Sequence, residues 1–165
     1  MKTLLKFVPI GILVVISSAS FSVAADIPKE GKYDITSCFT RVVNAVNFSN
    51  TQSAASFEQT GVSLSNPPGG LFDKEAIRCV GLTGSFDGKN ILNSVCEAVD
   101  SDGDKRLTHF YIGGDGKIVR EAVAGTGKYD GMVTTGTYQV LGKFPVIKEG
   151  TSQFCNRQVG TYKLK

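Results

Sequence analysis

Three aspartates within five residues are the side chains of this chain best suited to bind a metal ion. Asp100, Asp102 and Asp104 form the pattern D-x-D-G-D, which matches the first five positions of an EF-hand calcium loop. The match then fails, because Lys105 replaces the required glycine and Tyr111 replaces the required bidentate glutamate. The sequence therefore predicts a hairpin turn here and at most a weak calcium site, with an affinity no better than about 1 mM.

The run G-T-G-K, residues 125–128, has the composition of a phosphate-binding loop. Such a loop needs G-x-x-x-x-G-K-[ST] between a strand and a helix. Here Ala122 stands in place of the first glycine, and Tyr129 replaces the Ser or Thr that would hold a metal ion. The residues that follow resemble a strand, so the sequence argues against nucleotide binding. We expect the glycines to provide positive φ and close backbone approach, and Tyr129 to bury its ring.

The chain has four cysteines, Cys38, Cys79, Cys96 and Cys155, and none belongs to a Cys-x-x-Cys pair. A zinc site needs clustered Cys and His ligands, and the chain has a single histidine. An even number of cysteines in an exported protein is typical of disulfide bonds. We therefore predict two disulfides, whose partners depend on how the strands face each other.

The elements that position these residues are predicted from three Asp-Gly turns. A two-residue turn at Asp87-Gly88 pairs residues whose numbers sum to 175. Cys79 then faces Cys96 in a non-hydrogen-bonded pair, where facing side chains come closest, and Arg78 faces Glu97. This register predicts the disulfide Cys79–Cys96. The other two Asp-Gly turns, at residues 102–103 and 115–116, pair residues whose numbers sum to 205 and 231. Three successive hairpins of this kind make a meander.

The more aliphatic face of the meander is predicted to point inward. The same interior is expected to hold Arg78, Glu97 and Glu121, with Arg78 and Glu97 within hydrogen-bonding reach. Buried charge is costly unless paired, so it indicates either a functional site or a structural ion pair. The candidate ligand-binding residues are therefore these three and Phe110. His109 is predicted on the outer face without an acidic partner, and no catalytic residue can be named.

All four cysteines fall on the predicted outer face. Because Cys79 is assigned to Cys96, Cys38 must pair with Cys155, which joins the first strand to the last. A sheet whose ends meet is a closed barrel, and closure removes exposed edges. The predicted fold is all-β, a single antiparallel barrel, with a two-sheet sandwich as the alternative.

The N-terminus has the features of a secretory signal peptide. Lys2 and Lys6 precede an apolar run, residues 7–16, that is too short to span a bilayer. Val23 and Ala25 stand at the −3 and −1 positions of a cleavage site. We therefore expect export to the bacterial periplasm or to the outside of the cell.

Cleavage after residue 25 would separate a signal peptide, residues 1–25, from a single barrel domain, residues 26–165. That domain has sixteen basic and fifteen acidic residues, a net charge of +1. It contains no basic block, so neither a nucleic acid nor an anionic membrane is an expected partner. No membrane span is expected in the mature chain, and the sequence favours no particular oligomeric state.

The segment G-T-G-K-Y-D-G, residues 125–131, is followed by G-T-Y at 136–138 and preceded by D-S-D-G-D-K at 100–105. Together these motifs resemble a group of small exported bacterial proteins and, more loosely, the allene oxide cyclase and dirigent barrels. The resemblance covers roughly the C-terminal half of the chain. It implies eight antiparallel strands, with the glycine segment crossing one barrel end and Tyr129 as a plug. No catalytic residue of the allene oxide cyclases can be mapped onto this chain.

The lack of a visible catalytic constellation favours a non-catalytic binding module without a cofactor. Its expected partner is a small apolar ligand or another protein. The alternative is a cavity enzyme of the isomerase or cyclase kind, similar to allene oxide cyclase, with a polar group in an apolar cavity.

Overall fold

A computed structural model of the protein describes residues 27–165, so the predicted signal peptide at 1–25 lies outside the described residues. The described chain forms eight strands and one short 3-10 helix, η1. Their bounds are β1 (Glu30–Asn47), β2 (Gln52–Ser65), β3 (Glu75–Phe86), β4 (Lys89–Val99), β5 (Lys105–Ile112), β6 (Ile118–Gly125), η1 (Gly127–Tyr129), β7 (Val133–Lys143) and β8 (Thr151–Lys163).

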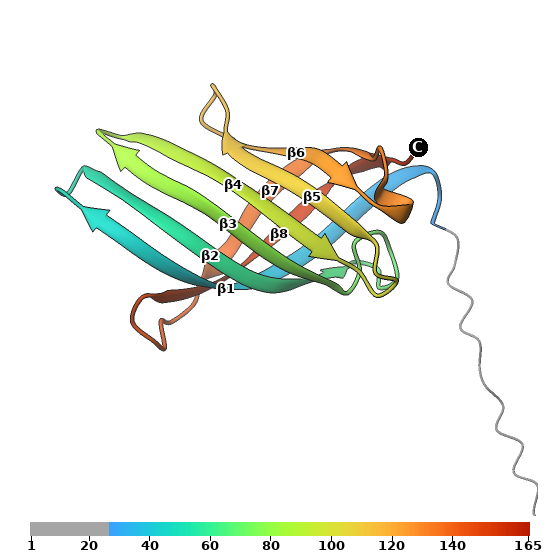
Figure 1. Ribbon diagram of the computed structural model, residues 1–165, viewed down its shortest axis with the longest axis horizontal. Coiled ribbons are helices and arrows are strands. Elements are labelled where there is room, and N and C mark those ends of the chain that lie inside the picture. Colours follow the sequence, from blue (N-terminus) through green and yellow to red (C-terminus); the bar gives the residue numbers. More distant parts are fainter. Residues whose placement is uncertain (1–26) are drawn as a thin grey trace, which may run out of the picture.

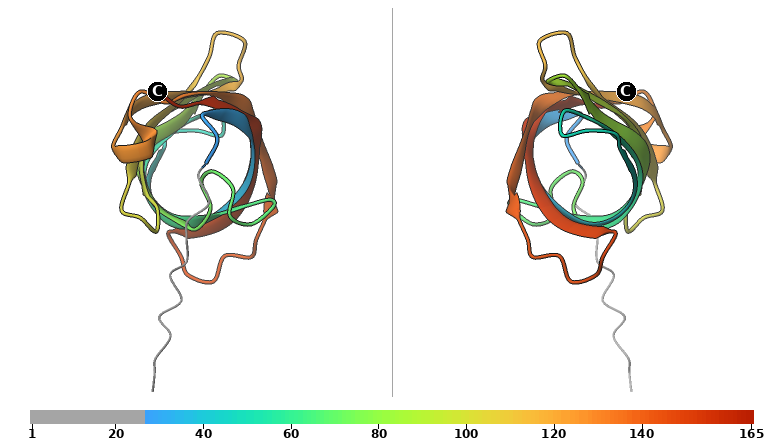
Figure 2. Two further views of the ribbon diagram at one scale, coloured as in Figure 1. Left: turned by 90° about the vertical axis from the view of Figure 1, so that its right-hand side faces the viewer. Right: turned by 90° about the vertical axis from the view of Figure 1, so that its left-hand side faces the viewer.

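The strands form one antiparallel sheet in the order β6-β5-β4-β3-β2-β1-β8-β7. Figure 1 shows neighbouring strands side by side, and the end-on views of Figure 2 show the sheet curled into a barrel. The barrel is nearly closed, because β6 and β7 approach each other but share no backbone ladder. We call this line between β6 and β7 the seam. The predicted single antiparallel barrel is confirmed, and the sandwich alternative is wrong.

The register predicted for the β3–β4 hairpin is confirmed. Asp87 and Gly88 have φ values of 50° and 83°, and a type I′ turn requires positive φ at both positions. Cys79 faces Cys96 across the ladder, and the predicted disulfide joins them.

The registers predicted for the next two hairpins are each wrong by one residue. Facing residue numbers sum to 204 between β4 and β5 and to 230 between β5 and β6. In both loops only the glycine of Asp-Gly has a positive φ, which is the geometry of a three-residue loop. Asp100 favours the longer first loop, because its carboxylate accepts hydrogen bonds from the backbone N–H groups of Asp102 and Asp104. An irregularity between Leu107 and Thr108 restores the sum of 231 for the last rungs.

The inner face predicted for β3 and β4 is also wrong. Cys79 and Cys96 are buried inside the barrel, whereas Val80 lies on the outer face and is 50% exposed. The interior of an eight-stranded barrel is just wide enough to be filled by side chains. At Gly81, a Cβ would lie only 2.8 Å from the ring of Phe57, so small residues are needed there. Several aliphatic residues of this hairpin, Val80, Leu82 and Val95, therefore face outward.

This inversion places three of the four candidate ligand-binding residues, Arg78, Glu97 and Glu121, on the outer face. Phe110 points inward as predicted, because the face error and the one-residue register error cancel in β5. His109 lies on the outer face of β5, also as predicted. The expectation that it has no acidic partner is wrong, because Oε2 of Glu121 lies 3.7 Å from its Nδ1.

The predicted disulfide Cys38–Cys155 is present and joins the neighbouring strands β1 and β8. Cys38 is exposed and lies on the outer face of the barrel, as the sequence predicted. The two cysteines are separated by 117 positions in the sequence, so this bond links the beginning of the domain to its end.

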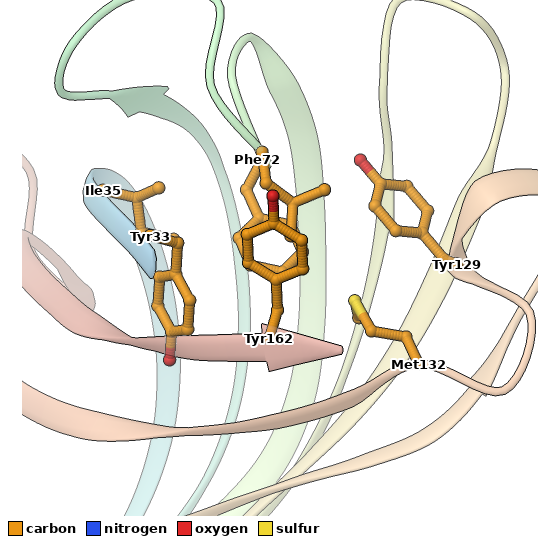
Figure 3. Packing of buried hydrophobic residues seen from close by; sticks show 7 residues of the cluster. Tyr33, Ile35, Phe72, Tyr129, Met132 and Tyr162 are labelled. Atoms are coloured by element: carbon orange, nitrogen blue, oxygen red, sulfur yellow. The ribbon is translucent and has the colours of Figure 1, made fainter. Parts of the chain in front are cut away.

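One end of the barrel is filled by buried side chains, and we call it the closed end. The segment between β2 and β3, residues 66–74, turns into this end in Figure 2 and inserts Phe72. The Phe72 ring centroid lies 5.2 Å from that of Tyr33, edge-on, and 5.9 Å from that of Tyr129, stacked. Tyr129 of η1 is 1% exposed and acts as a plug. Figure 3 shows this cluster, which also contains Ile35, Leu71, Met132 and Tyr162.

Replacing Cys38 and Cys155 together by alanine should lower the free energy of unfolding by about 3 to 5 kcal/mol, because the unfolded chain regains the entropy of a long loop. The bond lies on the outer face, so little core packing is lost with it. Urea denaturation measures the change through the transition midpoint. A loss below about 1 kcal/mol would contradict this expectation and show that the β1–β8 ladder holds these strands without the covalent link.

Candidate functional site

The D-x-D-G-D motif and the G-T-G-K segment contact each other at the closed end. The ammonium of Lys128 lies 2.6 Å from a carboxylate oxygen of Asp100 and 2.6 Å from one of Asp102. The backbone N–H of Lys128 donates to Asp104 at 3.0 Å. We call this arrangement the Lys128 clasp. Its ammonium stands where a bound cation would sit between the carboxylates of the D-x-D-G-D motif.

Gly127 allows the glycine segment to approach the β4–β5 loop. A Cβ at this position would lie 1.8 Å from Oδ1 of Asp104, and the φ of Gly127 is 51°. Thr126 adds two hydrogen bonds with Lys105, one through its backbone N–H and one through its hydroxyl. The glycine segment therefore uses close backbone approach to anchor Tyr129, and a strand, β7, follows it instead of a helix.

The charges of the clasp stabilise each other. Burial raises the pKa of the Asp100 carboxyl, but hydrogen bonds from Lys128 and Tyr129 outweigh this and hold the pKa below its usual value. Burial lowers the pKa of the Lys128 ammonium, and the two carboxylates outweigh it and raise that pKa. A lowered carboxyl pKa contributes stability at neutral pH, and this contribution is lost as the pH falls through the folded-state value.

A second ion pair lies inside the barrel. Arg106 donates from Nε and Nη2 to the two carboxylate oxygens of Glu75, at 2.8 Å and 2.6 Å. Ser63 donates to the same carboxylate, and Arg106 Nη1 donates to Thr108. The side chains of Arg106 and Glu75 are 6% and 0% exposed. Burial lowers the pKa of Arg106, but the charge of Glu75 and its hydrogen bonds have the larger combined effect and raise that pKa. These bonds make the pair a structural element of the closed end.

Sequence reasoning missed this pair, although part of the signal was present. Arg106 shares its face with Phe110 by simple alternation along β5, so an inward Phe110 implies an inward Arg106. Its partner Glu75 is the first residue of β3 and directly follows the β2–β3 segment.

The three outward candidates have partners on the surface and do not form an interior site. Arg78 faces Glu97 in the ladder, but the two make no hydrogen bond with each other. Exposed ion pairs of this kind contribute little to stability. The actual partners are Glu58 for Arg78, Lys105 for Glu97 and His109 for Glu121.

The opposite end of the barrel, the open end, contains a cavity of about 50 Å³. Phe110 is the one predicted site residue that lines it. The wall combines aromatic rings with amide, hydroxyl and guanidinium groups from inward positions of β1, β2, β7 and β8. The residues at these positions are Phe39, Arg41, Phe57, Gln59, Tyr138, Asn156 and Gln158.

Arg41 is the only charged side chain among the described residues that line this cavity. Its guanidinium carbon lies 4.3 Å from the ring centroid of Phe57 and 4.7 Å from that of Phe154. Nε donates to Gln59 at 2.9 Å, and among the described residues no carboxylate pairs with this guanidinium. Burial lowers the pKa of Arg41, and Tyr138 partly offsets that effect. A half-buried cation between two rings is therefore available to an anion.

A larger hollow of about 780 Å³ lies over the closed end, between its loops and the C-terminus. Several of its charges are already paired, because it contains the Lys128 clasp and an ion pair between Lys165 and Asp130. Asp73 in its wall accepts hydrogen bonds from the backbone N–H groups of Ser65 and Gly69. The hollow also has two lysines without a side-chain carboxylate partner among the described residues, Lys29 and Lys74, but both are exposed. The smaller cavity is the better candidate site, because its unpaired cation is half-buried between aromatic rings.

Comparison with protein family models, with curated proteins and with solved structures found no match to this chain. The resemblance to the allene oxide cyclase and dirigent barrels therefore stays a prediction. No helix within residues 27–165 has the length and apolarity needed to traverse a lipid bilayer.

Glu75→Gln and Glu97→Gln are matched substitutions in neighbouring strands and should have opposite outcomes. The first leaves Arg106 buried without its counter-charge and should lower the free energy of unfolding by about 3 to 5 kcal/mol. The second removes an exposed pair and should leave that free energy unchanged within error. Urea denaturation of both variants checks this. Equal losses would mean that the inner and outer faces of β3 and β4 are assigned wrongly.

Lys128→Met should lower the free energy of unfolding at pH 7 by roughly 1 to 3 kcal/mol, because it removes charge-assisted hydrogen bonds. The difference from wild type should begin to shrink below about pH 4, where free carboxyls protonate, and should vanish once the pH is below the lowered folded-state pKa of Asp100. Calorimetric titration of chelator-treated protein should give a calcium Kd no tighter than about 1 mM for wild type and tighter binding for the variant. Lys117→Met, at an exposed lysine, is the control. A micromolar isotherm for wild type would refute this account of the clasp.

Proposed function

We propose that this protein is an exported, disulfide-stabilised β-barrel that acts as a non-catalytic binding module at its open end. Its ligand is a small molecule that combines an apolar, planar part with an acidic group. The observation that carries this proposal is Arg41, a cation held between Phe57 and Phe154 without a carboxylate partner among the described residues. An acidic ligand group would complete this arrangement through bidentate hydrogen bonds.

The size of the cavity supports an acidic group as the part that enters it. Pockets for drug-sized ligands measure roughly 300–1,000 Å³, whereas this cavity measures about 50 Å³. It accommodates a carboxylate-sized group, and the rest of the ligand would lie along the mouth. The apolar side chains Leu92, Phe110 and Ile118 line that part of the wall.

Polar side chains beside Arg41 suit the same ligand. Burial raises the pKa of the Tyr138 phenol, so its hydroxyl stays protonated at neutral pH and can donate to an anion. Gln158 already donates to Asn156 at 3.0 Å, which fixes the orientation of both amides. A wall that presents donors and no carboxylate favours anions over neutral apolar molecules and over cations.

The lining of the cavity gives little support to the alternative of a cavity enzyme. Proton-transfer chemistry needs a positioned acid or base. Among the described residues that line the cavity, none is an aspartate, a glutamate or a histidine, and Cys96 is in a disulfide. Glu75 is fully buried at the other end and is bonded to Arg106. A binding role therefore fits the chain better than an isomerase or cyclase role.

A protein partner is the second candidate, and the rim of the open end favours it. Phe48 at the β1–β2 turn is 83% exposed, and Ile147 in the β7–β8 loop is 86% exposed. Exposed apolar side chains around a binding mouth are typical of interaction surfaces. Native mass spectrometry of protein purified without denaturation would separate the candidates, since it detects a bound small molecule or a bound chain directly.

Two disulfides indicate a non-reducing environment. Together with the predicted signal peptide they support a location in the bacterial periplasm or outside the cell. Peptide mapping of the N-terminus of the purified protein tests this part of the proposal, because an exported chain should begin at or near Asp26.

Arg41→Met should abolish binding of a small aromatic acid at the open end. Benzoate and its neutral analogue benzamide are suitable probes, followed by NMR chemical-shift changes of backbone amides. Wild type should bind benzoate about tenfold or more tighter than benzamide, because only benzoate forms charge-assisted hydrogen bonds. Arg78→Met, at an exposed arginine, is the matched control and should keep this preference. Equal affinity for the two probes in wild type would contradict the proposed role of Arg41.

A further inference from the structure

A third inward arginine, Arg120 of β6, lies in the closed end with most of its hydrogen-bonding capacity unused. Its Nη1 donates to the hydroxyl of Thr134 on β7. Its Nε and Nη2 are buried and have no hydrogen-bond partner among the described residues. Native proteins rarely leave buried donors unpaired, and an unpaired buried guanidinium indicates a site for a ligand or for water.

The hydroxyl of Tyr33 is a third unpaired donor in the same place. It is buried without a hydrogen-bond partner among the described residues, and the Tyr33 ring lies 5.5 Å from the Arg120 guanidinium carbon. A Cβ at Gly136 would lie 2.4 Å from this hydroxyl, so Tyr33 reaches the inner side of β7. Figure 3 shows Tyr33 and Phe72 in this cluster, and Phe72 also lies 5.3 Å from the guanidinium.

The charge of the inward arginines at the closed end is not fully balanced. Glu75 is the one carboxylate bonded to this group of inward arginines in the described chain, and Arg106 holds both of its oxygens. Burial, reinforced by the neighbouring Arg106, lowers the pKa of Arg120 to about 10. Arg120 is therefore still charged at neutral pH, and the group of Glu75, Arg106 and Arg120 has a net charge of +1. Aromatic rings compensate a buried cation only in part.

This site lies beside the seam. Arg120 and Thr134 lie on its two sides, and no backbone hydrogen bond joins β6 to β7 in the described chain. Separating the two strands here breaks side-chain contacts alone. A small displacement admits an ion of about the volume of a water molecule, ~30 Å³, whereas a bulky anion would require the strands to part much further.

We propose that Arg120 and Tyr33 bind one small monoanion inside the closed end, either a halide ion or a carboxylate of formate size. Arg120 Nε and Nη2 can only donate, and the Tyr33 hydroxyl adds a third donor to this group, which favours an anion over a cation. One negative charge neutralises the group of Glu75 and the two arginines. This site is distinct from the open end, since neither Arg120 nor Tyr33 lines the cavity that contains Arg41.

The test is thermal unfolding in sodium chloride, bromide or formate, with sodium gluconate keeping the ionic strength constant. For wild type, the unfolding temperature should rise with the small anion and then saturate, as binding to the folded state alone requires. Arg120→Met should show no saturating response and should be at least as stable as wild type in gluconate, because a buried unpaired charge has been removed. Chloride and formate titrations distinguish a halide site from a carboxylate site.

Three further measurements keep the test decisive. Tyr33→Phe removes one donor without changing charge and should weaken the anion about five- to tenfold. Arg41→Met should lose benzoate binding and keep the chloride response, so failure here and failure at the open end are distinguishable. Crystals grown in bromide should show an anomalous peak beside Arg120. A linear response that persists in Arg120→Met, or bromide found elsewhere only, would overturn the proposal.

Discussion

The width of the barrel interior decides what each strand can place inside it. Eight strands enclose a space that a few large side chains fill. Here aromatic rings from β1, β2, β5 and β8, and from the segments that carry Phe72 and Tyr129, occupy much of it. Gly81 and Gly136 lie against such rings, where a Cβ would come within 2.8 Å of Phe57 and 2.4 Å of Tyr33. The β3–β4 hairpin therefore contributes mainly small residues inward at this level, among them Gly81 and Ser94. Several of its aliphatic residues lie outside, and the alternation along the same strands places Arg78 and Glu97 on the surface.

The two ends of the interior handle charge differently. At the closed end Phe72 and Tyr129 exclude water, and the full hydrogen bonding of Arg106 with Glu75 matches that environment. At the open end Arg41 is half-buried and keeps contact with the cavity. Three inward arginines against one inward glutamate make the described interior an electropositive environment. Such an environment favours an acidic group over a basic one, in keeping with the proposed ligand.

Much of the fold could be predicted from local signals. Asp87-Gly88 fixed one register, and the facing of Cys79 and Cys96 confirmed it, because two independent patterns agreed. The inner face could not be predicted from hydrophobicity, because the rings that occupy the interior come from distant strands. The dipeptide Asp-Gly does not by itself fix the length of a turn. It also ends a three-residue loop when a preceding aspartate accepts hydrogen bonds from the loop backbone, as Asp100 does, and the register then shifts by one residue. The candidate site was missed for these reasons, except for Phe110, where two errors cancelled.

The position of the disulfides relative to the seam has a mechanical consequence. Both bonds connect strands that are already hydrogen-bonded neighbours, β1 with β8 and β3 with β4. Neither disulfide joins β6 to β7, so no disulfide crosses the seam. The two ends of the sheet are held together there by side-chain contacts and by the segment that carries Tyr129. The girth of the barrel thus depends on non-covalent contacts along this line even in the fully oxidised protein.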